Sequence, residues 1–165
     1  MSHSDVDVDA DPEAVARSIC LSQLDRAART RGQLADTMRR RLVPEDAAVR
    51  VLDRLQEVGL IDDEAFAAAW VQSRHSTKGL SGAALGRELR SRGVADETVA
   101  AAVGELDGET ELATARALAE RKLRSMSSLP SATQQRRLVS LLGRKGYPAG
   151  VSYRVVRELL TIDQA

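Results

Sequence analysis

Apolar residues recur three or four positions apart along most of the chain, with polar or charged residues between them. This spacing places the apolar side chains on one face of an α-helix. Asp11, Pro12 and Glu13 form a typical helix start, because they combine a capping carboxylate, a preset backbone angle and a favourable charge. The pattern from there onward predicts nine helices, separated by breaks at Gly32, 43–44, 59–62, 78–82, Gly93, 104–108, 125–130 and 146–148.

The same pattern occurs three times. Its centre is Leu34, Met38, Arg41 and Val43 in the first copy, Leu85, Leu89, Arg92 and Val94 in the second, and Leu138, Leu142, Lys145 and Tyr147 in the third. Upstream, the matching pairs are Val15 with Ile19, Phe66 with Trp70, and Ala119 with Leu123, and downstream they are Leu52 with Leu55, Val103 with Leu106, and Val156 with Leu159. Such a period indicates stacked supersecondary units, whose apolar positions we expect to face inward.

These observations predict an all-α fold of three tandem three-helix, helix-turn-helix-like repeats. We expect the repeats over residues 11–60, 61–107 and 108–165, after an acidic, disordered tail over residues 1–10. A unit of about fifty residues buries only a modest core. Neighbouring repeats are therefore expected to lean on one another in an elongated, curved array.

Composition supports a helical protein. Hydrophobic residues make up 43% of the 165 residues, yet only one Phe, one Trp and two Tyr are present, which leaves little material for strand packing. The chain has no apolar stretch long enough to cross a membrane and no signal sequence at its start, so a cytoplasmic protein is expected. The single Cys20 lies in an apolar helical stretch and is interpreted as a core residue.

The net charge of zero conceals an asymmetry. The first thirteen residues carry five carboxylates and no Lys or Arg, whereas the chain from Thr110 onward has ten basic and four acidic residues. The basic excess favours an acidic partner or a nucleic acid for the C-terminal third.

From Leu24 to Leu160 the chain resembles the RecX family of bacterial recombination regulators. The resemblance rests on LDRAARTRGQLADTMRRRL, on VLDRLQEVGLIDDEAFAAAWVQSR over residues 51–74, on LGRELRSRGV and on LLGRKGYPAGVSYRVVREL. Two residues depart from the family pattern, Leu42 where Gly is usual and Gln33 where an acidic residue is common. The resemblance implies a protein that binds in the groove of the RecA filament on single-stranded DNA and restrains its ATPase, strand-exchange and co-protease activities.

The sequence offers little for enzyme chemistry. A nucleophile needs a neighbouring base and a metal needs clustered ligands, but the candidates are limited to Cys20, His3 in the tail and His75, which is interpreted as a surface residue. The acidic run at residues 62–64 precedes a helix and is interpreted as a cap. Gly79, Gly82 and Gly86 lack the Lys and Ser/Thr of a phosphate loop and are interpreted as an inter-helix turn. We therefore predict no catalytic residues, no metal and no cofactor, and no nucleotide binding by the chain itself.

Clustered arginines are the predicted partner-binding residues, because the planar guanidinium binds carboxylates and phosphates through paired hydrogen bonds. The candidates are Arg39, Arg40, Arg50, Arg54, Arg87, Arg90, Arg136, Arg137, Arg144, Arg154 and Arg157.

Two readings of the function remain open from the sequence. The first is a monomeric regulator that binds the RecA filament and has only weak affinity for DNA. The second is a helix-turn-helix DNA-binding protein that acts without RecA, since each repeat has three short helices. The mixed charges of the helix over residues 44–58 disfavour the second reading. An enzyme of unknown type ranks last.

Overall fold

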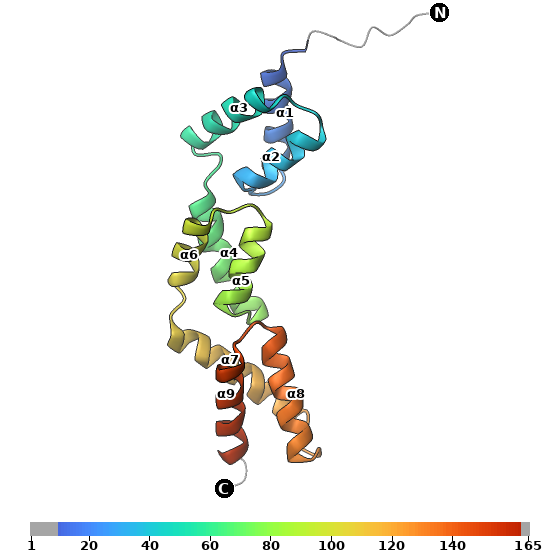
Figure 1. Ribbon diagram of the computed structural model, residues 1–165, viewed down its shortest axis with the longest axis vertical. Coiled ribbons are helices and arrows are strands. Elements are labelled where there is room, and N and C mark those ends of the chain that lie inside the picture. Colours follow the sequence, from blue (N-terminus) through green and yellow to red (C-terminus); the bar gives the residue numbers. More distant parts are fainter. Residues whose placement is uncertain (1–9, 163–165) are drawn as a thin grey trace, which may run out of the picture. The chain divides into compact units, whose positions relative to one another are not determined.

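The computed structural model describes residues 10–162, and this part of the chain contains nine α-helices and no strand (Figure 1). The helices are α1 (Pro12–Leu24), α2 (Arg31–Arg40), α3 (Glu45–Glu57), α4 (Asp63–Lys78), α5 (Gly82–Ser91), α6 (Asp96–Gly104), α7 (Gly108–Arg124), α8 (Ser131–Arg144) and α9 (Ala149–Ile162). The predicted all-α class and its three three-helix repeats are confirmed. The acidic tail predicted over residues 1–10 lies, apart from residue 10, outside the described residues, as does His3.

The chain forms two compact units that do not follow the repeat boundaries. The first unit contains the described residues up to Phe66 together with Arg92–Val94, and the second contains Ala67–Ser91 and the chain from Ala95 onward. The first unit therefore holds α1–α3, the start of α4 and the turn between α5 and α6. The second holds the rest of the second repeat and all of the third.

Side chains at the helix starts supply the missing acceptors for free N–H groups. Asp11 accepts a hydrogen bond of 3.1 Å from the Glu13 N–H, which confirms the predicted start of α1. Thr30 and Gln33 form a capping box at the start of α2. The chain thus breaks before α2 at residues 25–30, and the predicted break at Gly32 is wrong, since Gly32 lies in the first turn of that helix.

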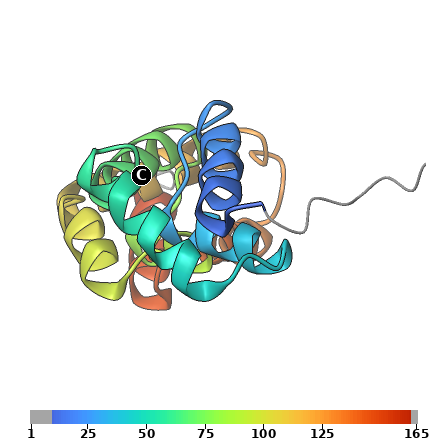
Figure 2. The same cartoon turned by 90° about the horizontal axis from the view of Figure 1, so that it is seen from above.

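The core of the first unit lies among α1, α2 and α3, which Figure 2 shows from above. Leu34 and Met38 of α2 are fully enclosed, and Cys20 of α1 lies with its Sγ 3.7 Å from the Sδ of Met38. The prediction that Cys20 is a core residue is confirmed. Burial raises the pKa of the Cys20 thiol, because the thiolate would lose its hydration there.

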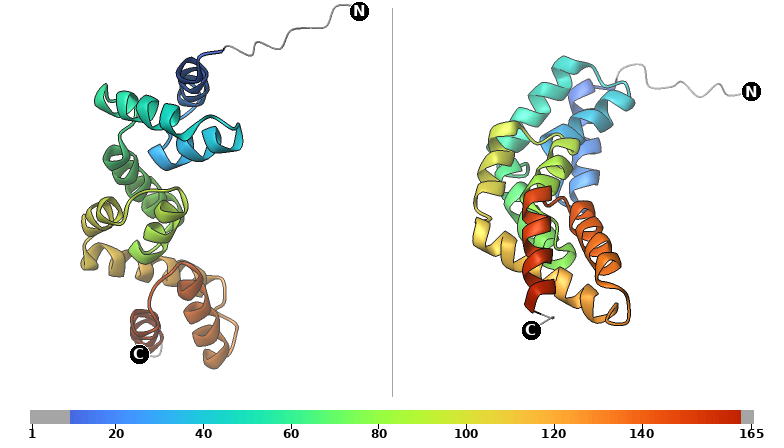
Figure 3. Two further views of the ribbon diagram at one scale, coloured as in Figure 1. Left: turned by 45° about the horizontal axis from the view of Figure 1, so that its top comes forward. Right: turned by 60° about the horizontal axis from the view of Figure 1, so that its bottom comes forward.

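The second unit contains a separate core in the third repeat. Leu138, Leu142, Val155 and Val156 are buried, and α8 and α9 pack side by side against α7, as Figure 3 shows. Leu138 and Leu142 match Leu34 and Met38 of the first repeat, and Leu85 and Leu89 of the second are equally buried. The predicted threefold pattern of inward positions is confirmed for these second helices.

The turn after each second helix has a left-handed residue at the matching position. This residue is Leu42 with φ 60°, Gly93 with φ 79° and Gly146 with φ 92°. After α2 the backbone closes with hydrogen bonds from Val43 N–H to Met38 O and from Leu42 N–H to Arg39 O, which together form a Schellman motif. Glycine adopts this conformation without strain and leucine does not, so the departure from the family pattern at Leu42 has a conformational cost.

Within the first unit, the Arg92–Val94 turn packs against the start of α2. The Thr30 hydroxyl donates a 2.5 Å hydrogen bond to the Arg92 backbone oxygen. Gly32 lies so close to Gly93 that a Cβ on Gly32 would stand 2.8 Å from the Gly93 Cα. Backbone meets backbone at this joint, and both positions therefore require glycine.

The second unit repeats this joint with different residues. The Lys145 backbone oxygen accepts a 2.9 Å hydrogen bond from the Ser81 N–H, and Gly146 packs against Ser81 and Ala84 near the start of α5. The Tyr147 hydroxyl donates a 2.9 Å hydrogen bond to the Gly79 backbone oxygen. Each joint thus unites the turn of one repeat with the start of the second helix of the repeat before it. Leu42 sits in the equivalent turn of the first repeat and is 88% exposed.

Some predicted inward positions are wrong. Val15 is 39% exposed, and Phe66 and Trp70 are only half-buried. Ile19 is buried as predicted, and the other buried positions of the two helices include Ala16, Cys20, Ala67 and Val71, each one residue after a predicted position. Small side chains occupy most of these positions, which allows the helices to approach closely, and the larger residues beside them remain partly exposed.

The predicted inter-helix turn at Gly79, Gly82 and Gly86 is also only partly correct. Gly79 lies between the helices with φ 65°, whereas Gly82 and Gly86 belong to α5 and are buried. A Cβ on Gly82 would meet the side chains of Glu111 and Val103 at 2.6 and 2.9 Å. These two glycines therefore permit close packing within the second unit.

Candidate partner-binding surfaces

The eleven arginines predicted to bind a partner are all exposed. They lie on α2, α3, α5, α8 and α9, so all three repeats contribute to the set. Their availability differs, because six of them form ion pairs with carboxylates of the described chain and five do not. This difference is the main feature that the structure adds to the sequence.

The paired arginines include all four candidates of the first repeat. Arg39 and Arg40 share Asp36, with N–O distances of 3.6 and 3.0 Å. Arg50 contacts Glu13 at 2.5 Å and Asp46 at 3.5 Å, and Arg54 contacts Glu57 at 3.2 Å. The remaining two are Arg90, 3.0 Å from Asp96, and Arg154, 3.1 Å from Glu158. Exposed pairs of this kind contribute about 0–1 kcal/mol each, but they neutralise the local charge.

The arginines without an ion pair in the described chain are concentrated in the third repeat. They are Arg87, Arg136, Arg137, Arg144 and Arg157. Arg137 and Arg144 lie two turns apart on one face of α8, and Arg144 donates a 2.8 Å hydrogen bond to Ser140. The third repeat therefore presents the positive charge that is least neutralised by the chain itself.

Glu158 of α9 limits how much of that charge is free. It accepts hydrogen bonds from Arg154 and from Arg116, and these bonds hold the pKa of its carboxyl below the usual range. Arg116 on α7 is not among the predicted residues. Its partner is 42 positions away, so sequence spacing alone could not identify this pair.

Sequence reasoning also missed a basic cluster on α7. Arg121, Lys122 and Arg124 lie in the last turn of the helix, are exposed and form no ion pair with residues 10–162. Basic residues at a helix C-terminus complement the helix dipole, which gives this cluster a structural role as well. The excess of basic residues after Thr110 already pointed to this cluster in the sequence.

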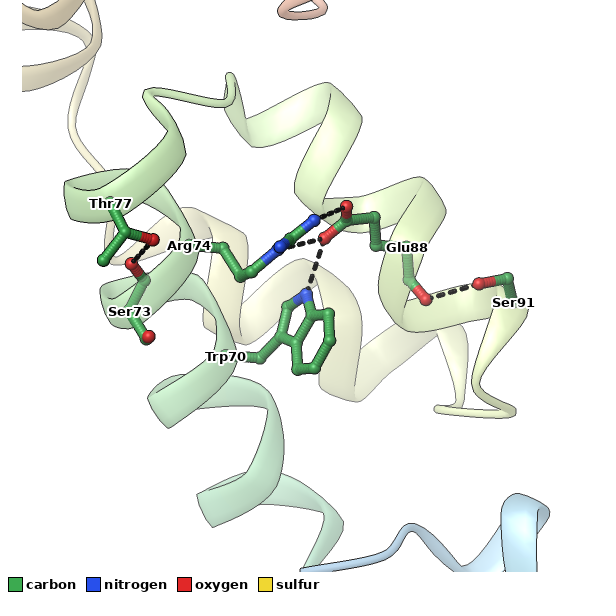
Figure 4. Close-up of polar contacts among 6 residues, drawn as sticks. All are labelled: Trp70, Ser73, Arg74, Thr77, Glu88 and Ser91. Carbon is green, nitrogen blue, oxygen red and sulfur yellow. Dashed lines mark hydrogen bonds and ion pairs between the residues drawn. The ribbon is translucent and has the colours of Figure 1, made fainter.

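Trp70, Arg74 and Glu88 form a polar cluster between α4 and α5, shown in Figure 4. Glu88 accepts hydrogen bonds from the Trp70 indole at 2.8 Å and from Arg74 at 2.5 Å and 3.1 Å. The guanidinium lies 5.4 Å from the Trp70 ring centre. The bond to Glu88 raises the pKa of Arg74, and the cluster keeps Trp70 from acting as a free stacking surface.

His75 is not the surface residue that the sequence suggested. It is 8% exposed, and its ring nitrogens lie 2.7 Å from the Leu80 backbone oxygen and 2.8 Å from the Thr114 hydroxyl. Both ring nitrogens are therefore used for packing within the second unit. The signal that could have revealed this lies 39 residues away at Thr114.

The described residues contain no group of three or more His, Cys, Asp or Glu side chains placed to hold a metal ion. None of their helices has the length and apolar character that a bilayer crossing requires.

Comparison with known families decides what kind of protein this is. Three models of RecX domains match the chain in order, the first three-helix domain over residues 16–55, the second over 62–103 and the third over 109–156. The chain belongs to the RecX family.

Two relatives named regulatory protein RecX are about half identical to the chain over the aligned residues. The protein of Thermobifida fusca is 51% identical over 150 residues, which are 91% of this chain and 81% of the relative. That of Streptomyces lividans is 52% identical over 150 residues, which are 91% and 80% of the two chains. The chain is therefore a member of a family of regulatory proteins.

Solved structures of RecX share the fold. The crystal structure of RecX from Lactobacillus salivarius has a TM-score of 0.81 at 21% identity and covers 90% of this chain and 97% of its own. A second crystal structure of regulatory protein RecX has a TM-score of 0.76 at 24% identity, with coverages of 90% and 72%.

Proposed function

We propose that this chain binds the RecA filament on single-stranded DNA and restrains its ATPase, strand-exchange and co-protease activities. The observation that carries the proposal is the match of all three RecX domains in their order along the chain. We further propose that the predicted arginines contact RecA or its DNA. Those without an internal carboxylate, Arg87, Arg136, Arg137, Arg144 and Arg157, are the leading candidates.

Tandem repeats suit a filament as partner. A filament presents the same surface at regular intervals, and once one repeat has bound, the others bind at a high effective concentration. Restraint of activity requires a difference in affinity, since a ligand that binds active and inactive filaments equally shifts neither state. The chain must therefore prefer an inactive filament or block the addition of subunits or DNA.

The alternative, a helix-turn-helix protein that acts on DNA without RecA, has less support. In such a protein the third helix of a repeat would present free basic residues to the major groove. On α3, however, Arg50 and Arg54 are paired with Glu13, Asp46 and Glu57. The charge that a recognition helix would need is neutralised on this helix.

The proposal is tested by the ATPase of RecA on single-stranded DNA with and without this protein. We expect inhibition at amounts of protein below those of RecA. The double variant Arg136→Glu with Arg137→Glu should need at least about tenfold more protein for half-inhibition, if two desolvated charge contacts of about 1 kcal/mol or more are lost.

The matched control is Arg17→Glu with Arg26→Glu, which makes the same charge change at exposed positions of the first repeat. A smaller effect of the control would identify α8 as a contact surface, whereas equal effects would mean that only net charge matters. An ATPase rate unchanged by the unaltered protein would refute the proposed function. A mobility assay with DNA alone measures the alternative, which predicts tight binding without RecA.

A further inference from the structure

A polar cavity of about 540 Å³ lies in the first repeat, between the end of α1 and one face of α2. It is lined by Gln23, Arg29, Gln33, Asp36, Thr37, Arg40 and Arg41. Three guanidinium groups thus line one cavity together with a single carboxylate. Two of the three, Arg29 and Arg41, are absent from the set of arginines that the sequence singled out.

The three arginines of this cavity carry more positive charge than its single carboxylate can neutralise. Asp36 is already shared by Arg39 and Arg40, at 3.6 and 3.0 Å. Arg29 and Arg41 form no ion pair with any residue from 10 to 162. The Arg29 Nε is buried and has no hydrogen-bond partner within those residues. A buried donor without an acceptor is unfavourable, so the described chain leaves the Arg29 guanidinium without a full set of partners.

In the second repeat, a carboxylate of the chain itself occupies the place that matches this cavity. Its Arg74 and Glu88 stand where the first repeat has Gln23 and Thr37, each 51 positions earlier in the chain. In the second repeat, the Glu88 carboxylate accepts from Arg74 and Trp70 and occupies the space between the helices (Figure 4). In the first repeat, Thr37 supplies no carboxylate and Asp36 pairs with Arg40, so Arg29 and Arg41 keep their charge for an external group.

The donors fit a phosphate better than a carboxylate. They come from three parts of the chain, the end of α1, the following loop and α2, so they approach a ligand from several directions. A tetrahedral phosphate offers oxygens in all of these directions, whereas a planar carboxylate accepts from one fork. Gln33 adds a neutral donor, because its Oε1 accepts from the Thr30 N–H and leaves its amide N–H groups for the cavity.

We propose that this cavity binds one phosphate group of a nucleic-acid backbone. Arg29 and Arg41 provide the charge, Arg40 divides its charge between the phosphate and Asp36, and Gln23 and Gln33 provide neutral hydrogen bonds. The cavity residues include no aromatic ring on which a base could stack, so the phosphate group supplies the contact. The contact is therefore independent of sequence and sensitive to salt.

The test is binding of a fluorescein-labelled oligothymidine of about twenty nucleotides to the full chain at low salt, without a recombinase. The double variant Arg29→Gln with Arg41→Gln should bind at least about tenfold more weakly, and the slope of log affinity against log salt should fall by about 0.7. The control Arg17→Gln with Arg26→Gln removes two exposed charges from the same repeat outside the cavity, and it should change affinity by less than about threefold.

A second variant tests the cavity without removing an arginine. Thr37→Glu places a carboxylate where the second repeat has Glu88, so it should weaken binding by about tenfold, as the arginine double variant does, while the thermal midpoint stays equal or rises. Ser18→Glu adds the same charge on the exposed surface of α1 and should leave most of the affinity intact. The arginine double variant removes the positive charge of the cavity, whereas Thr37→Glu neutralises it. A folding defect in one of these two variants therefore leaves the other informative.

Competitors distinguish the sources of the anion. An abasic oligodeoxyribose phosphate of equal length should displace the labelled strand as well as the oligothymidine does. Equal displacement by polyglutamate of the same charge, or by inorganic phosphate at the same phosphate concentration, would overturn the proposal. Equal losses in both arginine doubles would overturn it as well. Because no recombinase is present, failure here leaves the proposed regulation of RecA untouched, and failure of that regulation leaves the cavity untouched.

Discussion

The hydroxyl of Tyr147 donates a 2.9 Å hydrogen bond to the backbone oxygen of Gly79, across 68 positions of the chain. Both groups lie inside the second unit, where the turn before α9 meets the turn between α4 and α5. Burial, with a smaller effect of the Glu111 charge, raises the pKa of Tyr147 to about 12. This one side chain therefore couples the packing of two repeats to pH.

Tyr147→Phe tests this coupling. The unfolded chain ionises the phenol near pH 10 and the folded chain only near pH 12, so its contribution to stability is complete below pH 10 and is lost as the pH rises toward 12. The unaltered protein should lose about 1 kcal/mol more than the variant between pH 8 and pH 11. At pH 8 the variant should be less stable by about 1–2 kcal/mol, because the Gly79 oxygen loses its donor. Urea denaturation followed by circular dichroism measures both, with Tyr153→Phe as the exposed control.

Leu42→Gly should stabilise the protein. The backbone of Leu42 is in the left-handed conformation, and its side chain is exposed. Glycine at this position would relieve strain of about 1–2 kcal/mol and cost about 0.5–1 kcal/mol in chain entropy. The expected net gain is about 0.5–1 kcal/mol in urea denaturation. The reciprocal control is Gly59→Ala, which introduces strain at φ 81° where a Cβ meets nothing within 4 Å. A loss in the first variant, or a gain in the second, would contradict the assignment of strain at these turns.

Gly32→Ala should destabilise the first unit, although alanine normally favours a helix by about 1 kcal/mol. Its Cβ would stand 2.8 Å from the Gly93 Cα and 2.9 Å from the Gly93 oxygen, and backbone atoms cannot move aside as a flexible side chain can. We expect a loss of about 1–3 kcal/mol in urea denaturation. Gly143→Ala is the matched control on α8, where a Cβ meets nothing within 4 Å, and it should be neutral or stabilising.

Glu88→Gln should weaken the cluster of Trp70 and Arg74. An amide oxygen accepts less strongly than a carboxylate, and the side chains are partly exposed, so we expect a loss of about 1 kcal/mol. Trp70 is the single tryptophan of the chain, and its emission should change in the folded state. A double-mutant cycle with Arg74→Gln should give a coupling energy of about 0.5–1 kcal/mol. Zero coupling would show that the ion pair contributes nothing, and Glu120→Gln on the exposed face of α7 serves as the control.

The repeating core could be predicted from the sequence. Leu34, Leu85 and Leu138 each face inward, and the apolar spacing that places them there lies within a single helix. The positions in contact across repeats could not be predicted. The buried ring of His75 contacts Thr114 of another repeat. The net charge around Arg29 depends on which carboxylates of the folded chain lie near it. Spacing on one helix carries no information about partners 39 or more positions away. Leu42 is an intermediate case, since alignment with Gly93 and Gly146 marks its turn as unusual before any coordinates are known.

The separation of paired from unpaired arginines follows the same rule. Pairs three or four positions apart, such as Asp36 with Arg40, can be read from the sequence. Pairs such as Glu13 with Arg50, 37 positions apart, cannot. A list of arginines chosen from clustering alone therefore mixes neutralised residues with available ones.

The inclusion of Arg92–Val94 in the first unit has a consequence for protein synthesis. The ribosome delivers α1–α3 first, but the oxygen that Thr30 binds belongs to Arg92, 62 positions later. At about 5–20 residues per second, several seconds separate the emergence of the two. During that interval Gly32 of α2 stays exposed, because the Arg92–Val94 turn that packs on it has not yet been made. The first unit becomes complete only after most of the second repeat has been translated.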